Sequence, residues 1–221
     1  MKKGKYIVIE GGEGCGKTTQ AELLETYLKE KDIPCYFGRE PGGIKAAEEM
    51  RQILKHNSED ISSITEVFGF EFARAVFFDR IVIPKLEEGI NVISDRSGYS
   101  TVAYQDYGGG VDIEKIKTLN DIATFGIRPN LGIIIDINPE LGLTKEVVKD
   151  RFSAKGLEYH KRVREGYQNL NIWFPDNCGH NTKIKVIDYI PNGIEEMQNQ
   201  IRRYVNELFD EGYISPILEE E

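Results

Sequence analysis

The hydrophobic positions of the chain form short β-branched runs that are separated by longer, mostly amphipathic stretches. Five such runs occur, at Tyr6–Ile9, Cys35–Phe37, Val92–Ser94, Leu131–Ile137 and Ile184–Ile187. Strands that alternate with helix-length connections predict a parallel α/β sheet. Val92–Ile93 and Ile133–Ile135 are apolar at successive positions, which is typical of strands covered by helices on both faces. The pattern therefore predicts three layers, with a five-stranded parallel sheet between two layers of helices.

Two helices can be placed from the same pattern. Thr18–Lys31 predicts the first helix, which Asp32-Ile33-Pro34 ends. Ile64–Glu88 predicts a long helix that carries five phenylalanines, at Phe68, Phe70, Phe72, Phe77 and Phe78. One side of this helix is expected to pack on the sheet, while another lines a pocket. Residues 1–221 are interpreted as a single domain, because the chain has no linker or repeat and its length suits one buried core.

Charge and the N-terminal sequence exclude some classes of protein. The formal net charge is −9, which argues against a general nucleic-acid-binding protein, because such proteins usually carry a basic face. The apolar run Tyr6–Ile9 is too short for a membrane span or the core of a signal peptide. The sequence therefore predicts a cytoplasmic protein that binds neither nucleic acid nor membrane.

The strongest chemical signal follows the first predicted strand. Residues 11–18 match the phosphate-binding pattern G-x-x-x-x-G-K-[ST] and lead into the first predicted helix, which is the context that this P-loop motif requires. Its backbone N–H groups can surround the phosphates of ATP, and the helix N-terminus adds partial positive charge. Lys17 is expected to reach the β- and γ-phosphates, and Thr18 to offer its hydroxyl to Mg²⁺. The predicted ATP-binding residues are Gly11, Gly12, Glu13, Gly14, Cys15, Gly16, Lys17, Thr18 and Thr19.

The P-loop also contains a cysteine, Cys15. Cys15 is interpreted as a tolerated loop residue rather than a nucleophile, because no histidine nearby in the sequence could activate it.

A P-loop also needs a carboxylate at the end of a neighbouring strand to help hold Mg²⁺. Asp95 and Asp136 both end apolar runs. We favour Asp95, because Arg96 follows it and adds a phosphate-binding cation, while Asp136 stays open as the alternative.

A second glycine-rich turn follows the second predicted strand, in the segment Arg39-Glu40-Pro41-Gly42-Gly43. It lies at the carboxyl edge of the sheet, where ligands bind in open α/β folds. An arginine on a rigid turn can hold a monophosphate through two parallel hydrogen bonds, so Arg39 is a candidate for the acceptor phosphate.

These segments resemble those of the bacterial thymidylate kinases. The resemblance covers the glutamate-containing P-loop, the R-E-P-G-G segment, Phe70-x-Phe72-Ala73-Arg74, Asp95-Arg96 with Ser100, Ala103-Tyr104-Gln105 and Arg128-Pro129-Asn130-Leu131. It runs in order from about Lys5 to Tyr167. The resemblance implies a P-loop nucleoside monophosphate kinase that transfers phosphate from ATP to dTMP with Mg²⁺, and a homodimer.

The resemblance also implies roles for single residues. Arg39 and Arg96 would grip the dTMP phosphate, with Glu13 near the sugar hydroxyl and the metal. Phe70 would stack on thymine, and Arg74 and Thr101 would hydrogen-bond its polar edge. Tyr104 would fill the space that a ribose 2′-hydroxyl needs. The predicted substrate-binding residues are Glu13, Arg39, Phe70, Arg74, Arg96, Ser100, Thr101, Tyr104 and Gln105; the predicted metal residues are Thr18 and Asp95.

The sequence departs from the family in the lid, which we place at residues 143–156. Its cations are Lys145, Lys149, Arg151 and Lys155, and Ser153 stands where the family has a glutamate. Arg151 is the candidate transition-state contact, so Lys17, Arg96 and Arg151 are the predicted catalytic residues. Ser97 departs too, where Tyr or His is usual.

Two other functions remain as alternatives. One is a deoxynucleoside kinase, suggested by Asp95-Arg96-Ser97, although that function gives Arg39 no phosphate to bind. The other is a non-catalytic P-loop switch protein that binds ATP, which leaves Arg74 and Tyr104 without a role.

Overall fold

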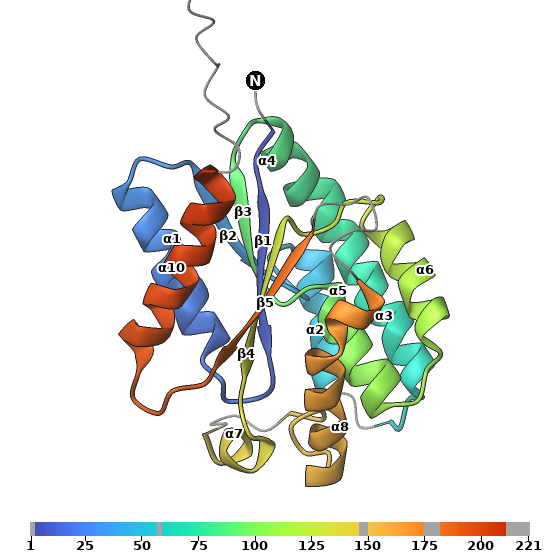
Figure 1. Cartoon of the computed structure of the whole chain (residues 1–221). Helices are drawn as coiled ribbons and strands as arrows, with labels where there is room; N and C mark the ends of the chain where they lie inside the picture. The colour runs from blue at the N-terminus through green and yellow to red at the C-terminus, as the bar shows by residue number, and fades with distance from the viewer. Residues whose placement is uncertain (1–2, 57–58, 146–149, 175–181, 211–221) are drawn as a thin grey trace, which may run out of the picture.

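A five-stranded parallel sheet forms the middle of the molecule (Figure 1). The computed structural model describes residues 3–56, 59–145, 150–174 and 182–210. The strands lie in the order β2-β3-β1-β4-β5. Their bounds are Tyr6–Gly11 (β1), Cys35–Arg39 (β2), Asn91–Asp95 (β3), Leu131–Asp136 (β4) and Lys183–Asp188 (β5). All five strands coincide with the predicted runs, and the predicted three-layer α/β fold is confirmed.

Helices cover both faces of the sheet. Helices α1 and α10 lie on the left in Figure 1, and most of the others lie on the right. The α-helices are Lys17–Glu30 (α1), Lys45–His56 (α2), Ser63–Phe77 (α3), Ile83–Glu87 (α4), Gly98–Thr101 (α5), Ile113–Ala123 (α6), Pro139–Lys145 (α7), Leu157–Gln168 (α8), Leu170–Trp173 (α9) and Ile194–Asp210 (α10). Two short π-helices, Phe78–Val82 (η1) and Val102–Gly108 (η2), continue α3 and α5.

Each central strand contributes side chains to two cores. In β1, Tyr6 and Val8 pack into the core beneath α3 and η2, whereas Ile7 and Ile9 pack into the core beneath α1 and α10. This division follows from the strand geometry, because successive side chains point to opposite faces. Burial of each such side chain stabilises the fold by about 1.5–3 kcal/mol relative to exposure. The continuous apolar runs in the sequence therefore reflect a sheet that is buried on both faces.

The long phenylalanine-rich helix packs on the sheet with one side and lines a cavity with another, as the sequence predicts. It comprises α3, η1 and α4, in which Phe77 and Phe78 are buried against the sheet. Phe70, in contrast, lines a cavity. Both Phe68 and Phe72 are exposed to solvent. The helix therefore links the sheet to a cavity and also leaves an apolar outer surface.

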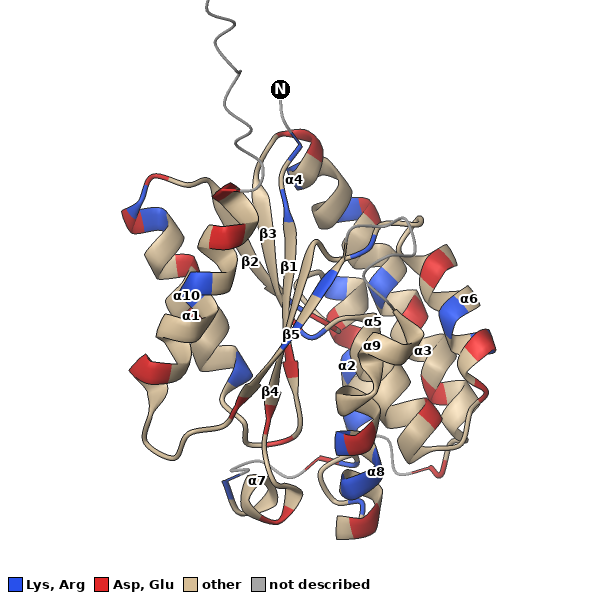
Figure 2. Ribbon diagram, in the orientation of Figure 1, with Lys and Arg blue, Asp and Glu red and all other residues tan. Residues whose placement is uncertain are grey.

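The distribution of charge does not form a single basic face in the view of Figure 2. Lysines and arginines alternate with acidic residues along α6 and α8. Within the described ranges, no helix is both long and apolar enough to cross a membrane.

Candidate active site

The P-loop connects β1 to α1 at the carboxyl edge of the sheet. Gly14 and Gly16 have φ values of 68° and 83°, in the left-handed region that favours glycine. A Cβ atom on Gly14 would also collide with the carbonyl oxygen of Gly142 in α7. Lys17 is almost fully buried, and its Nζ donates a hydrogen bond to the Gly12 carbonyl at 3.1 Å. The loop therefore has the shape, and the lysine position, that phosphate binding requires.

The end of β3 brings a carboxylate to the start of α1. The Thr18 hydroxyl donates a hydrogen bond of 2.5 Å to Asp95 Oδ2. The other oxygen of this carboxylate, Oδ1, is buried and has no hydrogen-bond partner among the described residues. Asp136 is instead held by Arg164, which donates hydrogen bonds of 2.6 and 2.8 Å to its two oxygens. The geometry therefore favours Asp95 over Asp136 as the carboxylate of a P-loop metal site.

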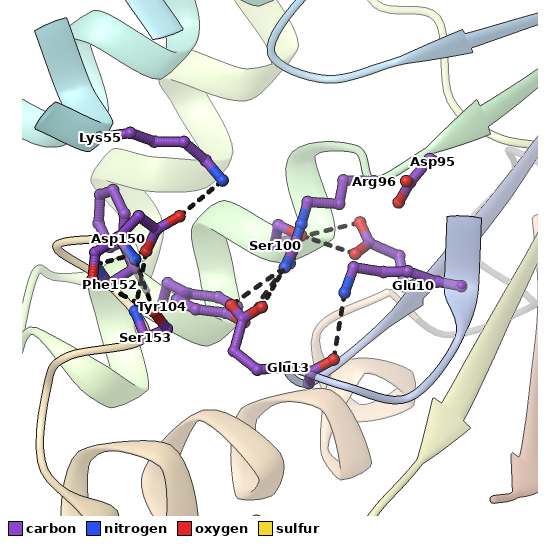
Figure 3. Close-up of polar contacts among 12 residues, drawn as sticks. Glu10, Glu13, Lys55, Asp95, Arg96, Ser100, Tyr104, Asp150, Phe152 and Ser153 are labelled. Carbon is purple, nitrogen blue, oxygen red and sulfur yellow. Dashed lines mark hydrogen bonds and ion pairs between the residues drawn. The ribbon is translucent and has the colours of Figure 1, made fainter. Parts of the chain in front are cut away.

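Glu13 ties the P-loop to the adjacent cavity (Figure 3). Its carboxylate accepts a hydrogen bond of 2.6 Å from the Tyr104 hydroxyl and one of 3.1 Å from Arg96 Nη2. Burial alone would raise the pKa of Glu13, but the charges of Arg96 and Lys17 and the Tyr104 hydrogen bond outweigh it and lower the pKa to about 2. Glu13 is therefore ionised and holds Arg96 at the boundary between the P-loop and the cavity.

Arg96 is held in an unusual backbone conformation by a buried carboxylate. Its φ of 75° lies in the left-handed region, which costs free energy for a residue with a Cβ atom. The fully buried Glu10 accepts hydrogen bonds from the backbone N–H groups of Ser97 and Ser100, at 2.7 and 3.2 Å, and from both serine hydroxyls. Ser100 Oγ in turn accepts a bond of 3.2 Å from Arg96 Nη1. Glu10 therefore fixes the turn that aims the Arg96 guanidinium.

A cavity that is open to solvent lies beside Glu13, between α2, α3 and η2. Seven of the predicted substrate-binding residues line it, namely Glu13, Phe70, Arg96, Ser100, Thr101, Tyr104 and Gln105. The cavity combines an aromatic face, polar groups and charges in one space, which is typical of a small-molecule site. The structure thus brings together most of the residues that the sequence selected for the acceptor.

Three residues predicted to contact the acceptor or the transition state are not among those that line the cavity. Arg39 is half-exposed and donates a hydrogen bond of 2.9 Å to Glu48. Arg74 lies behind the wall and donates to Glu40, Glu71, Asn120 and Thr101. Arg151 forms an ion pair with the buried Glu66. Arg39 as a phosphate ligand, Arg74 as a direct thymine contact and Arg151 as a transition-state contact therefore stay predictions.

The cavity also contains two cations that the sequence analysis missed. Arg51 and Lys55 project into it from α2, one helical turn apart. Arg51 donates a hydrogen bond of 2.9 Å to the Pro41 carbonyl. Burial, together with repulsion from Arg39 and Arg96, lowers the pKa of Arg51. Arg51 and Lys55 are four residues apart on the helix after the glycine-rich turn, and this spacing was the signal in the sequence that they share a helix face. Other charged residues of α2 have similar spacing, so the signal was not specific.

The described part of the lid lies over this cavity. Residues 146–149 of the predicted lid, including Lys149, are outside the described residues. Asp150 accepts hydrogen bonds of 2.9 Å from the backbone N–H groups of both Phe152 and Ser153, which makes a tight turn. The Phe152 ring contacts Phe70, with centroids 5.6 Å apart, and meets Tyr104 edge-on. The lid therefore adds Asp150 and Phe152 to the cavity wall.

Comparisons with known proteins all return the same family. A family model described as thymidylate kinase matches residues 9–201. A thymidylate kinase of Thermoanaerobacter sp. (strain X514) is 42% identical over 175 residues, which cover 78% of this chain and 86% of that protein. A thymidylate kinase of Symbiobacterium thermophilum is 39% identical over 92% of this chain and 93% of its own length. The crystal structure of thymidylate kinase from Ehrlichia chaffeensis superposes with a TM-score of 0.72 at 29% identity, covering 92% of this chain and 99% of that one.

Proposed function

The chain belongs to the thymidylate kinase family and phosphorylates dTMP, and we propose that ATP bound on the P-loop with Mg²⁺ supplies the phosphoryl group. The observation that carries this proposal is the contact of Glu13 with Arg96 and Tyr104. It joins the phosphate-binding loop directly to the acceptor cavity. An acceptor phosphate beside Arg96 would therefore lie next to the terminal phosphate of ATP, as in-line transfer requires.

The P-loop, which is the ATP-binding half of the site, would position the phosphates of ATP and neutralise their charge. The P-loop N–H groups and Lys17 would hold the β- and γ-phosphates and stabilise the charge on the transferring group. Phosphoryl transfer asks for little covalent chemistry from the protein, so no general base is needed. The rigid loop and the buried, pre-positioned Lys17 support this assignment, because fixed donors need no reorganisation during the reaction.

Thr18 and Asp95 would hold the metal ion. The unpartnered Asp95 Oδ1 supports this role, because a buried carboxylate oxygen without a hydrogen bond is costly unless it meets a ligand. No group of three or more His, Cys, Asp and Glu suited to a metal ion occurs among the described residues, which fits a P-loop site that relies on a hydroxyl, a carboxylate and phosphate oxygens. When bound, Mg²⁺ would supply positive charge that neutralises the phosphates of ATP.

The acceptor half would recognise phosphate, base and sugar separately. Arg51 and Arg96 supply cations for the phosphate, and Phe70 supplies a flat aromatic face for thymine. Thr101 and Gln105 supply hydrogen-bonding groups for the edge of the base. Tyr104 is held by Glu13, so its ring is fixed in the space proposed for the sugar. The Tyr104 ring would leave no space for a ribose 2′-hydroxyl, so the site would prefer a deoxyribose to a ribose.

The proposal is tested by measuring phosphate transfer from ATP to dTMP, thymidine, dUMP and UMP side by side. We expect dTMP to be the best acceptor and UMP to be poor, because a 2′-hydroxyl that is buried without a partner costs about 1–3 kcal/mol, or about 5- to 150-fold in selectivity. Thymidine should not be phosphorylated. Efficient transfer to thymidine instead of dTMP would indicate a deoxynucleoside kinase, and transfer to none of the four would favour the switch function.

We also propose that the chain forms a homodimer through α3. Ile64, Phe68 and Phe72 are four residues apart on one face of this helix, and 36%, 60% and 48% of their surfaces are exposed. A row of large apolar side chains on a helix face is typical of a protein interface. A second copy of the chain would cover this row.

Replacement of Phe68 by Asp should convert the dimer to a monomer, because it would place a charge in the centre of an apolar interface. The molar mass can be measured by light scattering during gel filtration. The matched control is Ile172→Asp in α9, which changes another exposed apolar residue, 68% exposed against 60% for Phe68, away from α3. The same mass for wild type and Phe68→Asp would place the interface elsewhere.

We also propose that the chain is one kinase domain, as the sequence predicts for residues 1–221 with a lid at 143–156, and that it is cytoplasmic, because ATP and dTMP are cytoplasmic metabolites.

A further inference from the structure

Three cations, Arg51, Lys55 and Arg96, line the acceptor cavity together with three carboxylates, and not every cation has a carboxylate partner. Arg96 is paired with Glu13, and Lys55 with Asp150, at 3.1 and 2.6 Å. Arg51 has no ion pair with any described carboxylate and donates a hydrogen bond to the Pro41 carbonyl. The remaining carboxylate of the wall, Glu40, pairs with Arg74, which also pairs with Glu71. Arg51, on α2, is therefore the cation of this wall that has no ion pair among the described residues, and Lys55 lies beside it.

We propose that Lys55 is a further binding residue for the acceptor phosphate, and that Asp150 occupies its ammonium group until the phosphate replaces it. This inference rests on the proposed function, because it names a further ligand for the same acceptor. Asp150 would be an internal competitor of the substrate rather than a substrate ligand.

The position of Lys55 supports a direct role. It lies on α2 one helical turn after Arg51, and both residues line the cavity together with Arg96. Figure 3 shows Lys55 and Asp150 pointing toward each other on the side of the site where Phe152 lies. Only 28% of the Lys55 side chain and 11% of the Asp150 side chain are exposed. The pair is therefore part of the wall and is not a solvent-screened surface bridge.

The local charges explain why a phosphate could replace Asp150. Burial and repulsion from Arg51 lower the pKa of Lys55, so the ammonium group gains from a strong anionic partner. Asp150 offers one negative charge, whereas a phosphomonoester carries about 1.5 to 2 and has three acceptor oxygens. A phosphate between Arg51, Lys55 and Arg96 could meet all three cations at once, which the lid carboxylate cannot do.

Asp150 would keep its other contacts after the exchange. Its Oδ1 atom accepts the hydrogen bonds from Phe152 and Ser153, whereas Oδ2 makes the ion pair with Lys55. The Arg151 backbone N–H also donates to the Lys55 carbonyl at 3.2 Å. The lid turn therefore has supports that do not depend on the Lys55 ammonium group. Loss of the ion pair would change the charge in the cavity and leave this turn in place.

The test compares dTMP with thymidine, which has the same base and sugar but no phosphate. We measure binding of both ligands by calorimetry and the KM values of dTMP and ATP for wild type, Lys55→Met, Lys55→Arg and Asp150→Asn. Lys45→Met is the matched control, because Lys45 begins the same helix and its side chain is 92% exposed.

Lys55→Met should weaken dTMP binding about 10- to 100-fold, the loss typical of one hydrogen bond to a charged group, while thymidine binding and the ATP KM change by less than about twofold. Lys55→Arg should restore most of the dTMP affinity. Asp150→Asn should tighten dTMP binding several-fold, because the phosphate then meets no internal competitor.

Unchanged dTMP binding in Lys55→Met, or an equal loss for thymidine, would overturn the role of Lys55. Unchanged or weaker dTMP binding in Asp150→Asn would overturn the role of Asp150 as a competitor. Wild-type enzyme that binds dTMP but fails to phosphorylate it would contradict the proposed function instead, and the binding comparison would still test Lys55.

Discussion

Replacement of Lys17 by Met is expected to lower kcat by a factor of about 10² to 10³ or more, with the fold intact. Lys17 Nζ is held at 3.1 Å from the Gly12 carbonyl, at the place where the β- and γ-phosphates of ATP would lie. Because the lysine supports charge that develops on the transferring group, its loss should appear in kcat more than in the KM of dTMP. The measurements are steady-state kinetics with dTMP and the thermal unfolding temperature.

The folded state should tolerate this substitution. Lys17 makes a single hydrogen bond to the loop, which is worth about 1 kcal/mol, and Met keeps the length of the buried side chain. Lys31→Met is a suitable control, because Lys31 is an exposed residue at the other end of the same helix. A folded Lys17→Met enzyme with near-normal kcat would exclude the P-loop as the donor site.

The sheet could be predicted from the sequence because the relevant signals are local. Alternation of apolar runs with helical stretches gives the strands, and continuous apolar runs show that both faces are buried. The P-loop could also be predicted from the sequence, because a strand, a glycine-rich loop and a helix follow one another in Tyr6–Glu30. The order of the strands was not predicted, because β2 and β3 are paired across more than fifty intervening residues.

The acceptor site was predictable only in part, because ion pairing depends on tertiary neighbours. Arg39 has a convincing position in the sequence, but Glu48 at the start of α2 competes for its guanidinium. Arg51 and Lys55 look like surface charges of an amphipathic helix until α2 is packed beside the cavity. Local sequence gives the number of cations but not which of them remain available for a ligand.

The departure at Ser97 has a structural explanation that the sequence did not offer. Ser97 Oγ donates a hydrogen bond of 2.8 Å to the buried Glu10, and its backbone N–H donates another of 2.7 Å. These bonds help to satisfy a carboxylate whose pKa is raised by burial. A small hydroxyl side chain at this position therefore supports the turn that carries Arg96.

Replacement of Arg96 by Met is expected to reduce kcat/KM for dTMP by a factor of about 10² to 10⁴, because two charge-assisted hydrogen bonds worth about 1.5–3 kcal/mol each would be lost from the transferring phosphates. The ATP KM should change much less. The substitution also leaves Glu13 without its ion pair, which should lower the free energy of unfolding by about 3–5 kcal/mol. The measurements are steady-state kinetics and chemical denaturation.

Two further measurements separate catalysis from stability. Glu13→Gln combined with Arg96→Met should recover stability but not activity, since no buried charge remains unpaired. The pKa of Glu13 falls from 4.5 to about 2 in the folded protein, so its contribution to stability is present above pH 4.5 and is lost as the pH falls toward 2. The stability difference between wild type and Arg96→Met should therefore shrink over that interval. A constant difference would mean that Arg96 does not hold Glu13 ionised, and near-normal kcat/KM for dTMP in Arg96→Met would remove Arg96 from the reaction.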